Sequence, residues 1–178
     1  MIKYALVIFL LFVGACTSIN SDCLNDKGFK RFDSALTKGI FDDTIMNKFF
    51  NDPAYLLPLR KQLCKHVKEY KRITYFEMFS PLLNGDRAGV IYLHDSKQFF
   101  SFSQRKHNAK LVFNEGVDKQ GFLYKLMMKF ENDFKWDSER FKNAYSEIKF
   151  TDAPGIKCVQ VNDSQASSFF IAYDPVGL

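Results

Sequence analysis

The hydrophobic period of the chain switches between helix-like and strand-like spacing, and this switching most constrains the fold. Over residues 29–70 apolar residues recur at spacings of three and four, the period of an amphipathic helix. From Ile73 to about residue 116 the pattern becomes strand-like, and helical spacing returns over residues 122–148. This order predicts an α+β domain with N-terminal helices, an antiparallel β-meander, one or two further helices and a C-terminal strand pair.

The N-terminal helices are defined by apolar stripes and end signals. Gly39 is placed to end the first helix, Asp42 or Asp43 can cap a second, and Asp52-Pro53 can begin a third. The apolar residues of these helices are Phe29, Phe32, Leu36, Ile45, Phe49, Leu56, Leu59, Leu63, Val67 and Tyr70.

The strongest helical pattern lies later in the chain. Asp137 or Ser138 can cap the helix that follows it. The apolar positions of the two segments are Phe122, Leu123, Leu126, Met127, Phe130 and Phe134, then Phe141, Tyr145 and Ile148.

The predicted meander consists of short β-rich runs that are separated by turn residues. Its turns are expected at Asp95-Ser96, His107-Asn108 and Glu115-Gly116, and the closing strands at Lys157–Val161 and Phe169–Tyr173.

Two strand patterns predict which faces of the sheet are buried. Val90–Leu93 is apolar on both faces, which indicates a central strand. Phe100 and Phe102 alternate with Ser101 and Ser103, which indicates one buried and one solvated face. We expect the helices to pack on one face of the sheet.

The first fifteen residues have the layout of an export signal. Lys3 precedes an apolar run over Tyr4–Val13, and the small residues Gly14 and Ala15 follow. The run is too short to cross a bilayer, which needs about 20 apolar residues. A basic start, an apolar centre and a small-residue end define a signal that leaves the mature chain, so these residues are excluded from the fold.

Residues 13–16, Val-Gly-Ala-Cys, resemble a bacterial lipobox. The resemblance implies that Cys16 is acylated and becomes the new N-terminus, and that the protein is a lipoprotein. Thr17 stands where aspartate would imply inner-membrane retention, so the resemblance implies an outer-membrane anchor that faces the periplasm. Ordinary cleavage nearby, with Cys16 as a disulfide partner, is the alternative.

The domain boundaries follow from these assignments. Residues 1–15 form the signal peptide, residues 16–25 a lipid-anchored polar tether, and residues 26–178 a single globular domain. About 160 mature residues is an ordinary length for one domain. No repeat, low-complexity stretch or linker divides them.

Export places the cysteines in an oxidising compartment. With Cys16 acylated, Cys23, Cys64 and Cys158 are odd in number, so one disulfide and one thiol are expected. We expect Cys23 to pair with Cys64, which closes the shorter loop; a bond between Cys64 and Cys158 is the alternative. The isolated cysteines and scattered histidines lack the paired spacing of a metal site, so none is predicted.

The exposed charges suggest a binding surface but no nucleic-acid partner. The formal net charge of +5 is mild, and acidic and basic residues are interspersed. It favours an acidic protein partner or an anionic surface. Opposite the apolar stripe of the third helix stand the basic residues Arg60, Lys61, Lys65 and Lys68, which form either a solvated face or a docking face for an acidic partner.

The chain contains no recognisable catalytic or cofactor motif. His94 and Asp95 are adjacent, but neighbouring strand residues point to opposite faces, so a strand-end histidine beside a turn-forming aspartate is expected. His66 and Glu69 have the spacing of a surface pair on a helix. We therefore assign no catalytic residue and no cofactor.

These observations favour a lipid-anchored protein of the bacterial cell envelope that binds a partner without catalysis. Immunity to a toxin and assembly of envelope machinery are two forms of such binding. The 20 phenylalanines raise the alternative of a carrier for a small apolar ligand, although a core needs such residues too. An envelope hydrolase is a third, weaker alternative.

Replacing the anchor residue, Cys16→Ser, should release the protein from membranes without unfolding it, because Cys16 lies outside the periodic segments that form the core. Membrane fractionation and circular dichroism would measure the two effects. A wild-type protein that is already fully soluble would contradict the assignment of the anchor.

Overall fold

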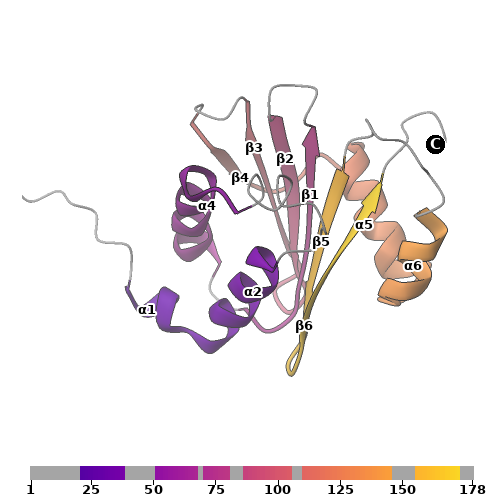
Figure 1. Cartoon of the computed structure of the whole chain (residues 1–178), viewed down its shortest axis with the longest axis horizontal. Coiled ribbons are helices and arrows are strands. Elements are labelled where there is room, and N and C mark those ends of the chain that lie inside the picture. Colours follow the sequence, from indigo (N-terminus) through magenta and orange to yellow (C-terminus); the bar gives the residue numbers. More distant parts are fainter. Residues whose placement is uncertain are drawn as a thin grey trace, which may run out of the picture.

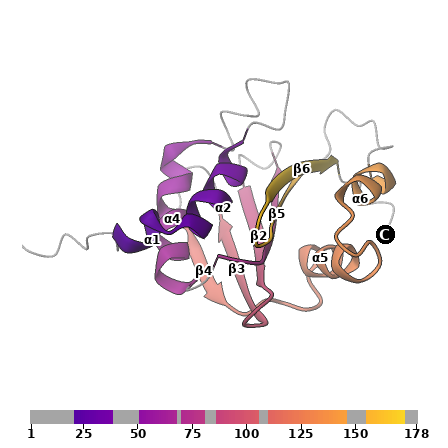
Figure 2. The same ribbon diagram turned by 90° about the horizontal axis from the view of Figure 1, so that it is seen from below.

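The computed structural model describes residues 21–38, 51–67, 70–80, 86–105, 110–145 and 155–172. In this part of the chain a sheet lies between helices (Figures 1 and 2). Its helices are α1 (Ser21–Asn25), α2 (Lys27–Thr37), α4 (Pro53–His66), α5 (Phe122–Asn132) and α6 (Ser138–Tyr145). Several sequence predictions fall outside it, among them the signal peptide with Cys16, the stop at Gly39, the helix capped by Asp42 or Asp43, the turn at His107-Asn108, Ile148 and Tyr173.

The six strands form one antiparallel sheet in the order β4-β3-β2-β1-β5-β6. The first four strands are the predicted meander, and the C-terminal hairpin adds beside β1. The α+β prediction is therefore confirmed. The strands are β1 (Ile73–Ser80), β2 (Asp86–Leu93), β3 (Gln98–Gln104), β4 (Val112–Glu115), β5 (Gly155–Val161) and β6 (Ala166–Ala172).

The helices cover both faces of the sheet, so the prediction that they pack on one face is wrong. Tyr75 of β1 packs in a core with α2 and α4, while the next residue, Phe76, packs in a second core with α5 and α6. Figure 2 shows the two groups of helices on opposite sides. Val90 and Ile91 of β2 divide between the two cores in the same way. A strand that is apolar on both faces requires both to be covered.

The sheet predictions for β2 and β3 are confirmed. β2 lies in the interior of the sheet. Phe100 and Phe102 of β3 are buried beneath the α4 side, and Ser101 and Ser103 on the other side are partly exposed. The Phe102 ring lies over Gly89, where an added Cβ would come within 2.0 Å of it. Glycine is therefore required at this position in β2.

The later helices follow the predicted stripe and cap. Leu123, Leu126, Met127 and Phe130 are the buried residues of α5, while Phe134 lies beyond the end of the helix. Asp137 caps α6, because its carboxylate accepts a hydrogen bond of 3.0 Å from the Arg140 backbone N–H.

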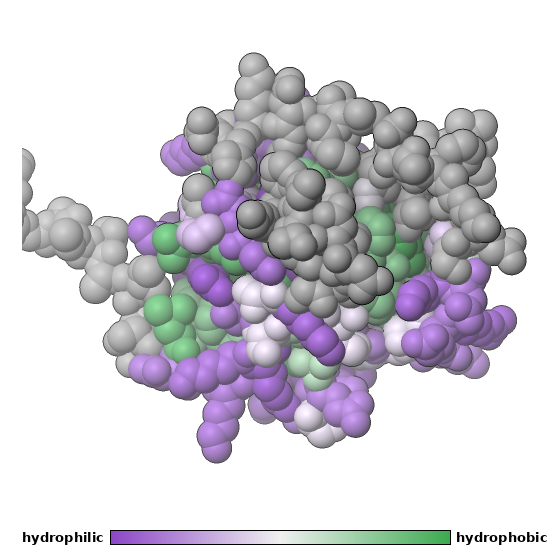
Figure 3. Space-filling view, in the orientation of Figure 1, coloured by the Kyte–Doolittle hydropathy of each residue, from purple (hydrophilic) through white to green (hydrophobic). Residues whose placement is uncertain are grey.

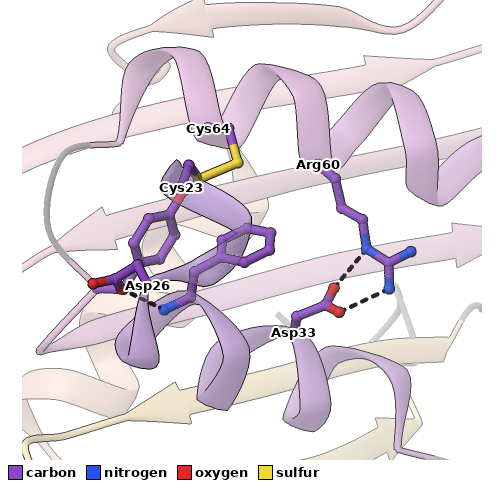
Figure 4. Close-up of a disulfide and its surroundings, with 7 residues drawn as sticks. Cys23, Asp26, Asp33, Arg60 and Cys64 are labelled. Atoms are coloured by element: carbon purple, nitrogen blue, oxygen red, sulfur yellow. Dashed lines mark hydrogen bonds and ion pairs between the residues drawn. A yellow bond between two sulfur atoms is a disulfide. The ribbon is translucent and has the colours of Figure 1, made fainter. Parts of the chain in front are cut away.

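The disulfide joins Cys23 of α1 to Cys64 of α4, with their Cα atoms 5.5 Å apart (Figure 4). This is the pairing that the sequence analysis preferred. The alternative with Cys158 is wrong, since Cys158 is a buried free thiol in the core on the other face of the sheet. Residues 21–25, assigned to the tether, form α1 instead, so the folded part begins before residue 26.

An ion pair reinforces the contact between the N-terminal helices. The Arg60 guanidinium on α4 donates two hydrogen bonds to the Asp33 carboxylate on α2, at 2.7 and 2.8 Å (Figure 4). Such a bidentate pair fixes orientation as well as distance. Asp26 starts α2 by accepting a hydrogen bond of 2.8 Å from the Phe29 backbone N–H. The disulfide and the ion pair together fix α4 against α1 and α2.

Removal of the disulfide by Cys23→Ser should lower the free energy of unfolding by about 4 kcal/mol, the chain-entropy value for a loop of this length. The separation of the two cysteines is 41 residues. Urea unfolding would measure the loss, and Cys64→Ser should give the same value. A clearly smaller loss for Cys64→Ser than for Cys23→Ser would contradict the pairing.

Candidate functional sites

The solvent-facing side of α4 carries an exposed stripe that begins at Pro53, the first residue of the helix. Leu57, Lys61 and Lys65 follow one another at a spacing of four and are all exposed. Leu57 is 48 % exposed, and Val112 is the other large apolar residue found exposed in the described part. We call Leu57, Lys61 and Lys65 the α4 face.

The four basic residues predicted as a docking face differ in exposure and in the contacts that they make. Lys61 and Lys65 are exposed on the α4 face. Arg60 lies at the side of the helix, where its side chain is 25 % exposed and bonded to Asp33. Lys68 lies outside the described residues. The sequence pattern placed Arg60 off the buried stripe but gave no sign of its partner on α2.

His66 connects the end of α4 to the edge strand β4. Its Nδ1 lies 3.2 Å from Glu115 Oε1, and its ring stacks on Phe113 with centroids 5.3 Å apart. The expected partner, Glu69, lies outside the described residues. The carboxylate of Glu115 is highly exposed, so this is a surface contact between the helix and the strand.

His94 belongs to a polar cluster that the sequence analysis did not find. Its Nε2 lies 3.0 Å from Thr74 Oγ1 of β1, and the Thr74 hydroxyl donates to Glu131 Oε1 of α5 at 2.6 Å. His94 Nε2 and Glu131 Oε1 are 3.5 Å apart. The residues are far apart in sequence, and only the packing of α5 on the sheet brings them together.

Aromatic rings enclose this cluster. The His94 ring lies 4.2 Å from the Trp136 ring and 4.3 Å from the Tyr92 ring, measured between centroids. Lys135 and Trp136 both have positive φ, 48° and 69°, which costs roughly 1–2 kcal/mol for a residue other than glycine. The turn between α5 and α6 accepts this strain and holds Trp136 against His94.

The burial of the cluster determines its protonation. The pKa of His94 is lowered to about 4, mainly by burial and in addition by the positive charge of Arg72, while the charge of Asp95 partly opposes the shift. Burial raises the pKa of Glu131, and the hydrogen bond from Thr74 partly opposes this shift. His94 is therefore neutral near pH 7. Asp95 stands in the predicted turn, with its carboxylate 4.0 Å from the Arg72 guanidinium.

The hydrogen bonds of the cluster run in one direction. The Thr74 hydroxyl donates its hydrogen bond to Glu131, so its oxygen can only accept from His94. We therefore assign the Nε2–H tautomer to His94, with that N–H donating to Thr74 Oγ1. In a nucleophilic site the histidine accepts the hydroxyl proton instead. Thr74 is also 0 % exposed. The cluster therefore has the order and burial of a structural network between β1, β2 and α5.

A second buried polar cluster lies under α2 and α4. Arg87 of β2 bonds to Glu77 of β1 at 3.1 Å, and the Tyr75 hydroxyl donates to the same carboxylate at 2.8 Å. Arg87 also stacks on the Tyr55 ring of α4 at 3.8 Å. A buried carboxylate in the middle of a sheet is stable only with such partners, so this cluster fixes α4 over β1 and β2.

Lys157 of β5 extends this cluster to α2. It lies directly opposite Glu77 in the sheet, and its ammonium group donates to the Leu36 backbone carbonyl. Burial lowers the pKa of Lys157 to about 8, although the charge of Glu77 opposes the shift. The lysine thereby satisfies one of the last carbonyls of α2.

Metal sites and membrane-spanning helices are two further classes of functional feature. No three His, Cys, Asp or Glu side chains in the described ranges gather as metal ligands. None of the helices described here combines the length and apolar character that a membrane span requires. No protein-family model, curated protein or solved structure matches the chain.

The fold should lose the stability contributed by neutral His94 as the pH falls from about 6.5 through about 4. The unfolded histidine has a pKa of about 6.5, whereas the folded one has a pKa of about 4, so the unfolded state takes up the proton first. The contribution is fully present above pH 6.5. Glu131 acts in the opposite sense, because its pKa is raised in the folded state.

Urea unfolding of wild type and His94→Gln over this pH range isolates the histidine. The stability advantage of the wild type should shrink by about 1 kcal/mol on acidification, after allowance for solvent screening. Glu131→Gln is the control for the opposing carboxyl group. An advantage that is constant over the range would contradict the assignment of a neutral, buried His94.

Proposed function

We propose that this chain is a lipid-anchored protein of the bacterial cell envelope that works by noncatalytic binding. The observation that supports the noncatalytic part is the state of Thr74, whose fully buried hydroxyl donates a hydrogen bond to the Glu131 carboxylate. The His94 and Glu131 side chains are 9 % and 7 % exposed. The Trp136 ring packs on the His94 ring and adds to the burial of the cluster.

The α4 face is the binding surface of this proposal. Its two lysines make no ion pair within the described part of the chain, and Leu57 adds exposed apolar area. The helix beneath them is fixed by the Cys23–Cys64 bond and the Arg60–Asp33 pair. A rigid surface loses less entropy on binding than a mobile one, and its charge favours a negatively charged partner.

The location of the protein rests on the first sixteen residues. The export-type layout and the lipobox-like sequence at Cys16 support an acylated N-terminus, with an outer-membrane anchor facing the periplasm. Several acyl chains would hold the domain persistently, since a single chain binds a bilayer only marginally. The oxidising compartment also agrees with a disulfide in the folded domain.

The packing of the phenylalanines supports a core role over an apolar-ligand pocket. Phe130 contacts Phe141 and Phe76, with ring centroids 4.8 and 5.8 Å apart. Phe141 also contacts Phe134 and Phe169 at 5.0 and 6.1 Å. These rings fill the space between α5, α6 and the sheet. Packing of the core therefore accounts for the high number of phenylalanines.

Reversing the charge of the α4 face should abolish function, whereas removing the histidine should not. Lys61→Glu with Lys65→Glu should fail to restore the phenotype of a deletion strain, because attraction becomes repulsion. Lys125→Glu with Lys129→Glu is the matched control, since these lysines are also four apart and exposed, on α5. Thermal melts would show that each variant is folded.

His94→Gln is the test of the noncatalytic part. The variant should restore function as long as its melt shows a folded protein at the assay temperature. Loss of function with an unchanged melt would mean that His94 takes part in chemistry, and it would overturn the proposal.

A further inference from the structure

We propose that the α4 face lies against the bilayer that carries the anchor and contacts its anionic lipid headgroups. The proposal rests on the acylation of Cys16 in the proposed function and names the negatively charged partner of the same surface. It follows from the length of the connection between Cys16 and α4, from the position of α4 in the molecule, and from the chemistry of the α4 face.

The covalent path from the anchor to α4 is short. Cys16 is seven residues before Cys23, a distance that a fully extended chain spans in at most about 25 Å. Cys23 is bonded to Cys64, which is the residue before Lys65 on α4. The distance from Cys16 to the lysines of α4 is therefore limited to the extended length of residues 16–23, the disulfide and about one turn of α4, which lets these lysines reach the headgroups.

Among the described elements, α4 lies where its exposed side can meet a surface. Helices α1 and α4 lie together at one end of the molecule, and α5 and α6 lie at the other (Figures 1 and 2). The end that contains α1 and α4 shows hydrophobic surface beside hydrophilic side chains (Figure 3). A protein held by this end would present α5 and α6 to the aqueous phase.

The α4 face has the composition of a helix that lies in a membrane interface. Lysines reach anionic headgroups while an apolar residue on the same side of the helix, here Leu57 one turn before Lys61, enters the acyl boundary. α4 contains no acidic residue over its 14 residues. Arg60 is held by Asp33 on one side and His66 by Glu115 on the other, so the outward charge is that of Lys61 and Lys65.

The size of the α4 face favours a bilayer over a protein. A stable protein interface buries about 800 Å² on each partner, far more than one leucine and two lysines provide. On a membrane, each lysine near an anionic surface strengthens binding about fivefold. The anchor makes the contact intramolecular, and a tethered contact gains from its high effective concentration. Two lysines are then sufficient to set the orientation.

Amine labelling of the lipidated full chain in vesicles tests the proposal. The protein is reconstituted in phosphatidylcholine vesicles with and without phosphatidylglycerol, and acylation of each lysine is followed by mass spectrometry. Lys61 and Lys65 should react about fivefold more slowly in the anionic vesicles, and high salt should remove this protection. Lys125 and Lys129 should react at the same rate in all conditions.

The outcomes separate the two proposals. Failure of the protein to float with vesicles overturns the lipid anchor and, with it, the orientation. A protein that floats but labels equally at Lys61, Lys65, Lys125 and Lys129 overturns the orientation alone. If, in addition, Lys61→Glu with Lys65→Glu abolishes capture of a protein from solubilised membranes, the α4 face binds an acidic protein and the bilayer proposal is wrong.

Discussion

The burial of β1 on both faces is the constraint on which the rest of the structure depends. Tyr75 and Phe76 are neighbours in sequence, yet they are fully buried in different cores. Because successive strand residues point to opposite faces, the strand requires one helix layer for each. The polar residues of β1 divide in the same way: Thr74 bonds to Glu131 of α5, and Glu77 bonds to Arg87 beneath α4. Hydrophobic burial brings the layers together, and these buried networks determine where each helix lies.

Local patterns in the sequence were sufficient to predict the disulfide and the described elements apart from α1, which was assigned to the tether. The stripes of α2, α4 and α5, the cap at Asp137 and the alternation in β3 all depend on residues a few positions apart. The Cys23–Cys64 pairing followed from the position of both cysteines beside the N-terminal helices. The helix layers were assigned wrongly because an apolar strand shows that both faces are covered but does not say by which segment.

The polar clusters could not be predicted from the sequence for a different reason. Thr74 and Glu131 are 57 residues apart, and Arg60 and Asp33 are 27 apart. No spacing rule links such pairs. The sequence therefore suggested Asp95 as the carboxylate beside His94, whereas the structure places Glu131 there. The same limit applies to Arg60. It is polar and lies off the apolar stripe, but its side chain binds Asp33 of α2 within the fold. Of the predicted basic face, only Lys61 and Lys65 are both described and without an ion-pair partner in the described part of the chain.

The proposed anchoring and orientation of the domain depend on one covalent path, from an acylated Cys16 through Cys23 to Cys64 in α4. Tryptic digestion of the membrane-extracted protein without reduction, followed by mass spectrometry, tests the whole path. Cleavage after Lys27, Lys61 and Lys65 would leave residues 16–27 bonded to residues 62–65. The account predicts this linked pair, beginning at Cys16 and carrying the mass of its acyl chains. A pair without acyl mass, an N-terminus at another residue, or a bond from Cys64 to Cys158 would contradict it.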